Sequence, residues 1–444
     1  MLAAPSKSTV REELLFRIQQ ARRLSDELFA VVRPEALYDR PIPERHRIIF
    51  YLGHLEAFDW NLLHQRLFHL SPFDPQSDRL FAFGIDPVGG GLPADKASDW
   101  PTEKRVREYV GRVRDTLDEA IESLPFSGNE TDEFPAELLL NVAIEHRLMH
   151  AETLAYMLHQ LPLNRKVLQS RRAELHTPAV TPGMVEIAAG SATLGLRRAQ
   201  GEFGWDNEFE AHEVSVPAFA IDRFPITNAQ FLEFLQAGGY ENRSLWDEAD
   251  WEWRESENIT HPAFWLRRAD EWLFRGMFGE VPLPLDWPVY VSHAEAAAFA
   301  RWVGKRLPTE AQWHRAAYGS PDGAERDYPW GHNAPAPAPA YGNFDFASWN
   351  PTPVNAFPEG KSAWGVSDLL GNGWEWTSTV FGPFSGFEPF SFYRGYSADF
   401  FDGKHFVLKG GSARTAACMM RRSFRNWFQG HYQYVYAGFR CVSQ

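Results

Sequence analysis

The chain has 444 residues, a formal net charge of −14 and two cysteines, Cys418 and Cys441. This length predicts at least two domains, and the acidic balance argues against nucleic acid as a partner, because phosphates attract basic surfaces. Two cysteines exclude a disulfide framework and any cysteine-rich zinc site, so a bound metal would need histidine or carboxylate ligands.

The first half of the chain, residues 8–160, shows the 3.6-residue apolar period of amphipathic helices. In chain order we expect helices over 10–32, from Pro43 to Leu70, over 102–124 and over 135–161. A stretch rich in Gly, Pro and Asp at 72–100 predicts a long loop. Four such helices predict a four-helix bundle, which we assign to residues 1–162.

The second half has a different pattern, with a polar linker expected at 163–182 and a second domain at 183–444. Short strand-like runs alternate there with loops rich in Gly, Pro, Asn and Trp, which predicts an α+β domain dominated by loops. The runs are 184–190, 212–227 and 406–413, and two short helices are expected at 227–239 and 293–304. Most of the 17 tryptophans lie in this half, as packing residues or as aromatic walls around a cationic ligand.

No uninterrupted apolar run approaches the ~18–20 residues of a membrane-spanning helix. The N-terminal residues also lack the basic start and apolar block of a signal peptide. We therefore expect a cytoplasmic protein without a membrane partner. The sequence leaves its oligomeric state open.

Histidines in two of the predicted helices indicate a metal site. His146 and His150 are one turn apart, so their imidazoles share one face of the helix. The second helix offers a third ligand, and we favour His54 because apolar residues flank it. The other histidines of that helix lie nearer its ends, among charged residues: His46, His64 and His69.

The histidine pattern alone leaves the metal undecided. Glu145 precedes His146, whereas in the HExxH zinc motif the glutamate follows the first histidine. Three neutral nitrogens suit zinc or iron. The alternative is that the three are ordinary histidines with hydrogen-bond partners and no metal.

Four blocks in the second half resemble the signatures of the formylglycine-generating-enzyme fold, a C-type-lectin-like domain. They are "GKRLPTEAQW" (304–313), "LLGNGWEWT" (369–377), "LKGGSA" (408–413) and "YAGFRC" (436–441). Formylglycine enzymes use a cysteine pair near the "GGS" block, and Cys418 has no close partner in the sequence. That chemistry is therefore not expected here, and the fold alone does not give the function.

The combination of domains is more specific. A DinB-like bundle with "HLEAF" and "EHRLMHAE", fused to a domain with "FGWDNEFEAHEV" (203–214) and "SFRNW" (423–427), resembles the ergothioneine sulfoxide synthases over nearly the whole chain. The resemblance implies a non-haem iron enzyme in which His54, His146 and His150 hold Fe(II). Its small-molecule substrates would be hercynine (Nα-trimethylhistidine), a thiol and O2. The thiol is joined to C2 of the hercynine imidazole as a sulfoxide.

The resemblance also implies substrate residues in the second domain. Asn426 and Trp427 stand where the family contacts hercynine. In "FYRGYS" (392–397), Tyr393 would be the proton donor, and Tyr396 would line the trimethylammonium pocket, since aromatic faces attract such cations. The alternative for Tyr393 is a packed loop tyrosine, with Tyr396 or a residue of the 82–100 loop as the donor of the proton.

Two departures from the family concern the sulfur donor. Members that use γ-glutamylcysteine carry arginines before the third helix, where this chain has Asp99 and Trp100. They also have Asp after the Asn-Trp pair, where this chain has Phe428. These departures favour free cysteine as the donor. Two alternatives stay open: a selenoneine synthase, which takes a selenosugar and forms a C–Se bond, and a non-catalytic binding protein of the same fold.

Overall fold

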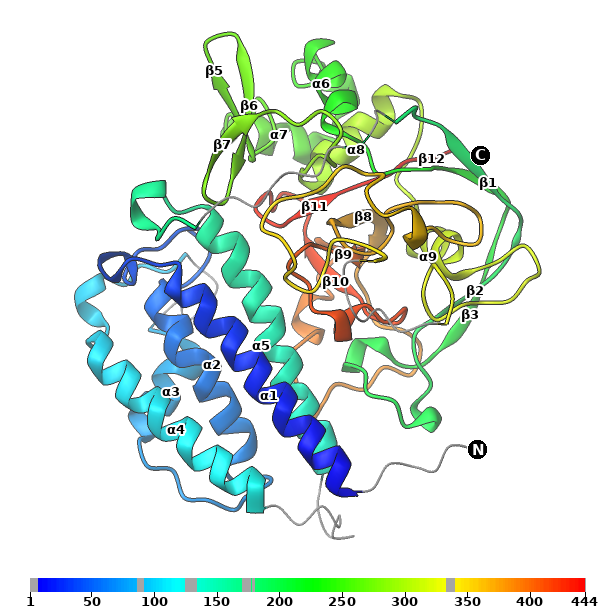
Figure 1. Ribbon diagram of the computed structural model, residues 1–444. Coiled ribbons are helices and arrows are strands. Elements are labelled where there is room, and N and C mark those ends of the chain that lie inside the picture. Colours follow the sequence, from blue (N-terminus) through cyan, green and yellow to red (C-terminus); the bar gives the residue numbers. More distant parts are fainter. Residues whose placement is uncertain are drawn as a thin grey trace. The chain divides into compact units, whose positions relative to one another are not determined.

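The computed structural model describes residues 7–85, 92–123, 134–169, 177, 180–332 and 340–443. The chain divides into two compact units, Met1–Ser170 and Arg171–Gln444, both drawn in Figure 1. Much of the predicted linker 163–182 lies outside the described residues. None of the described helices is both long enough and apolar enough to span a membrane.

The first unit is the predicted bundle of four long helices (Figure 1). They are α1 (Lys7–Ala30), α2 (Ile48–Leu63), α4 (Glu103–Ser123) and α5 (Ala136–His159). Helix α1 packs on α5, while α2 packs on α4 and α5. On the apolar face of α1, Leu14, Ile18, Ala21 and Leu28 are buried, and Leu15 and Leu24 are half-buried. Burial of one apolar face per helix is what the 3.6-residue period requires.

Two local predictions in this unit were wrong. The second helix was expected from Pro43 to Leu70. It begins only at Ile48, because the chain at Arg47 is still extended, and it ends at Leu63. The expected loop at 72–100 contains another helix, α3 (Pro75–Phe83), which packs on α2. The start of α3 has a local cause: the Asp74 carboxylate accepts the backbone N–H of Ser77 at 3.2 Å, and Pro75 occupies the first turn.

The second unit is the predicted α+β domain of short strands and long loops. A four-stranded sheet has the order β10-β9-β8-β11, and a three-stranded sheet has the order β1-β4-β12. Their strands are β1 (Met184–Ile187), β4 (Phe219–Asp222), β8 (Gly373–Val380), β9 (His405–Gly411), β10 (Asn426–Gln429), β11 (Ala437–Gly438) and β12 (Val442–Ser443). Strand β10 pairs antiparallel with β9, placing Trp427 opposite Val407. Asn426 and Trp427, the last two residues of the "SFRNW" block, therefore lie on a strand of this sheet.

The remaining elements of the second unit were predicted in part. Both expected helices are present, as α6 (Asn228–Gln236) and α8 (His293–Trp302), each begun by a capping box. Two antiparallel groups complete the strands: β2 (Gly190–Leu194) with β3 (His212–Val216), and β5 (Trp265–Arg268) with β6 (Glu271–Gly276) and β7 (Gly279–Pro282). The β5–β7 meander and the helices α7 (Glu248–Ser256) and α9 (Glu310–Tyr318) were not predicted.

Candidate metal centre

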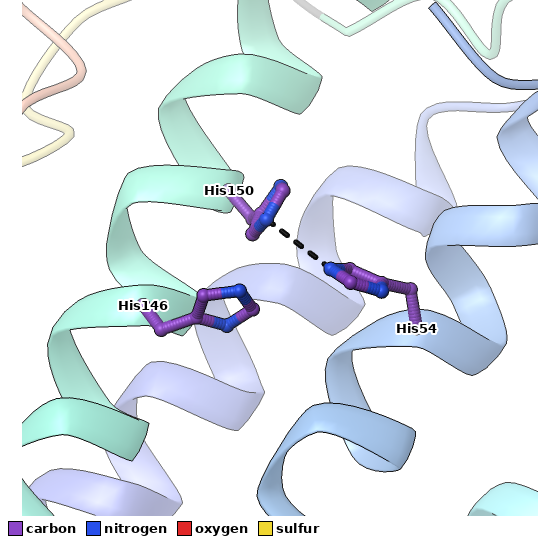
Figure 2. A group of neighbouring side chains, drawn as sticks. All are labelled: His54, His146 and His150. Atoms are coloured by element: carbon purple, nitrogen blue, oxygen red, sulfur yellow. Dashed lines mark hydrogen bonds between the residues drawn. The ribbon is translucent and has the colours of Figure 1, made fainter. Parts of the chain in front are cut away.

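Three imidazoles face one another between two helices of the first unit, as Figure 2 shows. His54 comes from α2, and His146 and His150 come from successive turns of α5. One ring nitrogen of each lies within 4.8 Å of those of the other two. Within the described ranges, no other set of three His, Cys or acidic side chains converges in this way. The structure thus brings together the three histidines that the sequence singled out.

The orientation of His54 is set by the backbone of α3. Its Nδ1 lies 2.7 Å from the carbonyl oxygen of Phe81. A carbonyl only accepts, so Nδ1 carries the proton and the lone pair of the neutral ring is on Nε2. That Nε2 lies 3.3 Å from Nε2 of His150. The contact therefore turns the lone pair of the His54 Nε2 atom toward His150.

The three rings are kept neutral by their surroundings. Burial lowers the pKa of His54 from its usual 6.5 to about 4. Burial, together with the neighbouring histidines, holds the pKa of His146 and His150 well below the usual value. Metal binding requires the unprotonated imidazole, so each ring is in its ligand form at pH 7.

Aromatic side chains pack against the rings of the three histidines. Phe50 stacks on His54, with ring centroids 4.7 Å apart. Phe58 lies nearly parallel to His146, at an interplanar angle of 9°. These contacts restrict ring rotation, as is needed for a preformed site.

A buried ion-pair network adjoins the ligands. The guanidinium of Arg147, the residue after His146, lies 2.7 Å from carboxylate oxygens of both Glu56 and Asp59 on α2. Arg114 of α4 also lies 2.7 Å from Glu56. The network joins α2 to α4 and α5 next to His54 and His146, and so fixes the register in which the ligand residues meet.

The residues fit a divalent transition metal. Neutral imidazole is a common ligand of iron and zinc, with metal–nitrogen distances of about 2.0–2.1 Å for zinc. The buried Nδ1 of His150 has no hydrogen-bond partner among the described residues. Three protein ligands also leave coordination positions for other molecules.

The rejected histidines of the second predicted helix lie apart from this group. His46 precedes α2 and packs on Phe50, with ring centroids 4.2 Å apart. His64 follows the last residue of α2, with its Nδ1 2.7 Å from the carbonyl oxygen of Trp60. His69 lies beyond the helix, with a positive φ of 53°.

Within the second unit, three of the four predicted substrate residues belong to one aromatic cluster. The ring centroid of Tyr396 lies 5.7 Å from that of Tyr393 and 5.3 Å from that of Trp427. Tyr396 is 7% exposed, whereas Tyr393 and Trp427 are partly buried. Asn426 is the neighbour of Trp427 on β10, and its side-chain oxygen accepts the Trp427 backbone N–H at 2.9 Å.

Burial also affects the phenol of Tyr393, the predicted proton donor. Burial raises its pKa to about 12, with a smaller contribution from the nearby Asp206 carboxylate. The hydroxyl therefore keeps its proton at pH 7. A donor must still reach the group that it protonates, so this role stays a prediction.

The positions that concern the sulfur donor are engaged within the first unit. The indole of Trp100 is 6% exposed and donates to Asp95 at 2.6 Å. The Asp99 carboxylate accepts the backbone N–H of Lys96 at 2.7 Å. The Asp95 carboxylate also forms ion pairs with Arg40 and with Arg47. Trp100 and Asp99 thus offer no cation to a substrate carboxylate.

Sequence patterns missed three residues that shape these sites: Phe81, Arg147 and Trp205. Phe81 acts through its backbone carbonyl, which no residue-type pattern reveals. Arg147 directly follows His146, and Glu56 comes two residues after His54. Opposite charges at these positions of two apolar helices were the signal that could have predicted their ion pair. Trp205 was part of a recognised block but had no assigned role.

The comparisons with known proteins agree with both units. The DinB superfamily matches residues 17–154, and the sulfatase-modifying factor enzyme 1-like domain matches residues 171–444. The chain is 34% identical to the "Hercynine oxygenase" of Mycobacterium tuberculosis, over 86% of this chain and 90% of that protein. It is 33% identical to the protein of the same name from Mycolicibacterium smegmatis, over 94% and 98%.

A fungal relative extends the comparison. The chain is 28% identical to "Ergothioneine biosynthesis protein 1" of Neurospora crassa, over 92% of this chain and 55% of that protein. The bundle and the second domain were both expected from the sequence, and the family models confirm this combination. The chain belongs to the family of the hercynine oxygenases, which confirms its resemblance to the ergothioneine sulfoxide synthases.

Proposed function

We propose that this protein is an O2-dependent non-haem iron enzyme of ergothioneine biosynthesis, which joins a thiol to C2 of the hercynine imidazole as a sulfoxide. The observation that carries the proposal is the convergence of His54, His146 and His150 in a chain about one-third identical to hercynine oxygenases. Three neutral nitrogens suit Fe(II) and leave positions for substrates.

The chain's own residues divide the work between holding the metal and binding hercynine. When bound, Fe(II) supplies the one-electron chemistry that lets O2 oxidise a closed-shell thiol. Trp427, Asn426 and Tyr396 bind hercynine, with aromatic faces toward its trimethylammonium. Tyr393 holds a proton on its phenol oxygen and delivers it during the reduction of oxygen.

We propose cysteine as the sulfur donor rather than γ-glutamylcysteine. The family's arginine positions hold Asp99 and Trp100, and both side chains have partners inside the first unit. An additional glutamyl carboxylate would therefore meet no cation from these positions. The same observation accommodates a selenosugar, which lacks that carboxylate, so selenoneine synthesis is the second candidate.

The decisive experiment is an aerobic assay of the Fe(II)-loaded protein with hercynine and one donor at a time. The donors are cysteine, γ-glutamylcysteine and a selenosugar, and products are followed by mass spectrometry with 18O2. We expect a cysteine–hercynine adduct that contains one labelled oxygen. An adduct with the selenosugar alone would establish the second candidate. Hercynine binding without any product, in iron-loaded protein, would instead favour a non-catalytic binding protein.

A further inference from the structure

The segment from Trp205 to Glu208 has no part in the proposed function, although it lies in the recognised block "FGWDNEFEAHEV". Trp205, Asp206 and Glu208 are each 0% exposed, and Asp206–Glu208 form a short 3-10 helix. Burying two carboxylates so close together is unfavourable unless each has specific partners. Those partners show what the segment does.

Asp206 and Trp205 contact the loop that carries both tyrosines. The Asp206 carboxylate accepts the Ser397 hydroxyl at 2.6 Å. Burial raises the pKa of Asp206, while the Ser397 hydroxyl opposes this rise. The indole of Trp205 stacks on Tyr396, with centroids 4.0 Å apart. Asp206 and Trp205 therefore both contact the tyrosine loop, at Ser397 and at Tyr396.

Glu208 binds the other substrate segment, the residues that lead into β10. Its carboxylate accepts the Ser423 hydroxyl at 2.6 Å and Nε of Arg421 at 2.9 Å. The guanidinium of Arg425 donates to the carbonyl oxygen of Asn207 at 3.3 Å. The next residues along the chain are Asn426 and Trp427. Carboxylate hydrogen bonds of this kind are among the stronger ones in proteins.

We infer that Trp205–Glu208 is a positioning segment for the hercynine pocket: Asp206 holds the tyrosine loop and Glu208 holds the approach to β10. The inference rests on the proposed function for the identity of the substrate. Neither carboxylate is placed against hercynine. They act through Tyr393, Tyr396 and Trp427, whose spacing decides how well the ligand fits.

The test uses Asp206→Asn and Ser397→Ala in the full-length, Fe(II)-loaded protein. The side chain introduced by Asp206→Asn keeps an acceptor oxygen but loses the carboxylate, so it weakens the hydrogen bond from Ser397, and Ser397→Ala removes that bond. The matched control is Glu295→Gln: Glu295 is also 0% exposed and accepts a hydroxyl, that of Tyr240, at 2.5 Å, but its partners lie in neither substrate segment. The measurements are KM for hercynine, kcat, iron content and thermal stability.

We expect each of the two variants to raise KM for hercynine by about tenfold, with a smaller change in kcat and full iron content. The double variant should be no worse than the poorer single variant, because both changes act on the same hydrogen bond. Equal KM values in Asp206→Asn, Ser397→Ala and Glu295→Gln would overturn the inference, since they would reveal only a general loss of stability.

Hydrogen exchange separates this inference from the proposed function. In Asp206→Asn, exchange should accelerate at 390–397 and stay unchanged in the sheet around β8. Uniform acceleration across the second unit would refute the positioning role, whatever the substrate. If the wild-type protein does not react with hercynine, the proposed function fails, and the exchange pattern alone decides whether Asp206 holds this loop.

Discussion

The Nδ1 atom of His54 is hydrogen-bonded to the carbonyl oxygen of Phe81, which ties a candidate metal ligand on α2 to the backbone of α3. The contact depends on how closely the two helices approach. A Cβ added at Gly53 would lie 2.4 Å from the ring of Phe81, which is closer than two carbon atoms that are not bonded can approach. The glycine beside His54 therefore allows α3 to reach it.

Gly53→Ala should weaken metal binding. The methyl group must push Phe81 and α3 away, which releases Nδ1 of His54 and frees its ring to turn. Loss of such a supporting hydrogen bond typically costs 10–100-fold in metal affinity, and we expect a loss of about tenfold in a chelator competition assay. The matched control is Gly111→Ala on α4, where an added Cβ meets nothing within 4 Å. Equal affinities in the two variants would contradict this account.

The sequence was sufficient for the bundle and for the three histidines that the fold brings together. The helical period identified α1, α2, α4 and α5, and the apolar residues around His54 separated it from His46, His64 and His69. The period could not reveal α3, which depends on a local Asp-Pro start. Nor could it reveal the bond to Phe81, because a backbone carbonyl has no residue-specific signal.

The aromatic cluster of the second unit was predictable only through family resemblance. Trp205, Tyr396 and Trp427 are widely separated in the sequence and meet through loops that have no regular period. The short strand runs indicated which segments form sheets but not how the loops between them pack. Trp205 shows the limit most clearly, because its block was recognised while its contact with Tyr396 was not.

Arg147→Met should destabilise the first unit strongly. The change removes the cation between Glu56 and Asp59 and leaves two buried carboxylates close together, for which a loss of roughly 3–5 kcal/mol in unfolding free energy is typical. Urea unfolding of the metal-free protein, followed by helical circular dichroism, measures the loss. Arg107→Met is the control, since Arg107 forms an exposed pair with Glu103 and should cost less than about 0.5 kcal/mol. A similar small loss in Arg147→Met would show that the network is not stabilising.

Metal affinity should change little as the pH falls from 7 to 5.5. The pKa of His54 is lowered to about 4, and those of His146 and His150 lie well below 6.5, so protons do not compete in this range. A site of three imidazoles with ordinary pKa values would lose metal affinity on the order of several hundredfold over this range. We expect the affinity to fall by less than about tenfold in anaerobic Fe(II) titrations. A hundredfold loss of affinity would be incompatible with neutral, buried imidazoles.

The same pKa shifts affect the stability of the metal-free protein. Below pH 6.5 the unfolded chain binds more protons than the folded chain, because each of these histidines has a lower pKa when folded. Stability is therefore fully present above pH 6.5 and falls as the pH decreases toward 4. His54→Phe should make this fall shallower in metal-free urea titrations. An unchanged pH profile would mean that His54 does not resist protonation in the folded state.

Tyr393→Phe should preserve binding and abolish most of the coupling chemistry. The substitution removes one hydroxyl and keeps the ring that packs 5.7 Å from Tyr396, so iron content and hercynine affinity should match those of the wild type. A phenol with a pKa of about 12 is protonated at pH 7 and can deliver that proton when oxygen is reduced. Without it, we expect the C–S product to fall at least tenfold and the thiol to be oxidised alone. Product and oxidised thiol are both measured by mass spectrometry in one reaction.

Tyr396→Phe is the comparison for Tyr393→Phe. The hydroxyl of Tyr396 has no assigned step, so its removal should change product yield less. If Tyr393→Phe retains full yield and rate while Tyr396→Phe loses them, the proton comes from Tyr396. If neither changes, the donor is a residue outside this pair, and the 82–100 loop becomes the place to search.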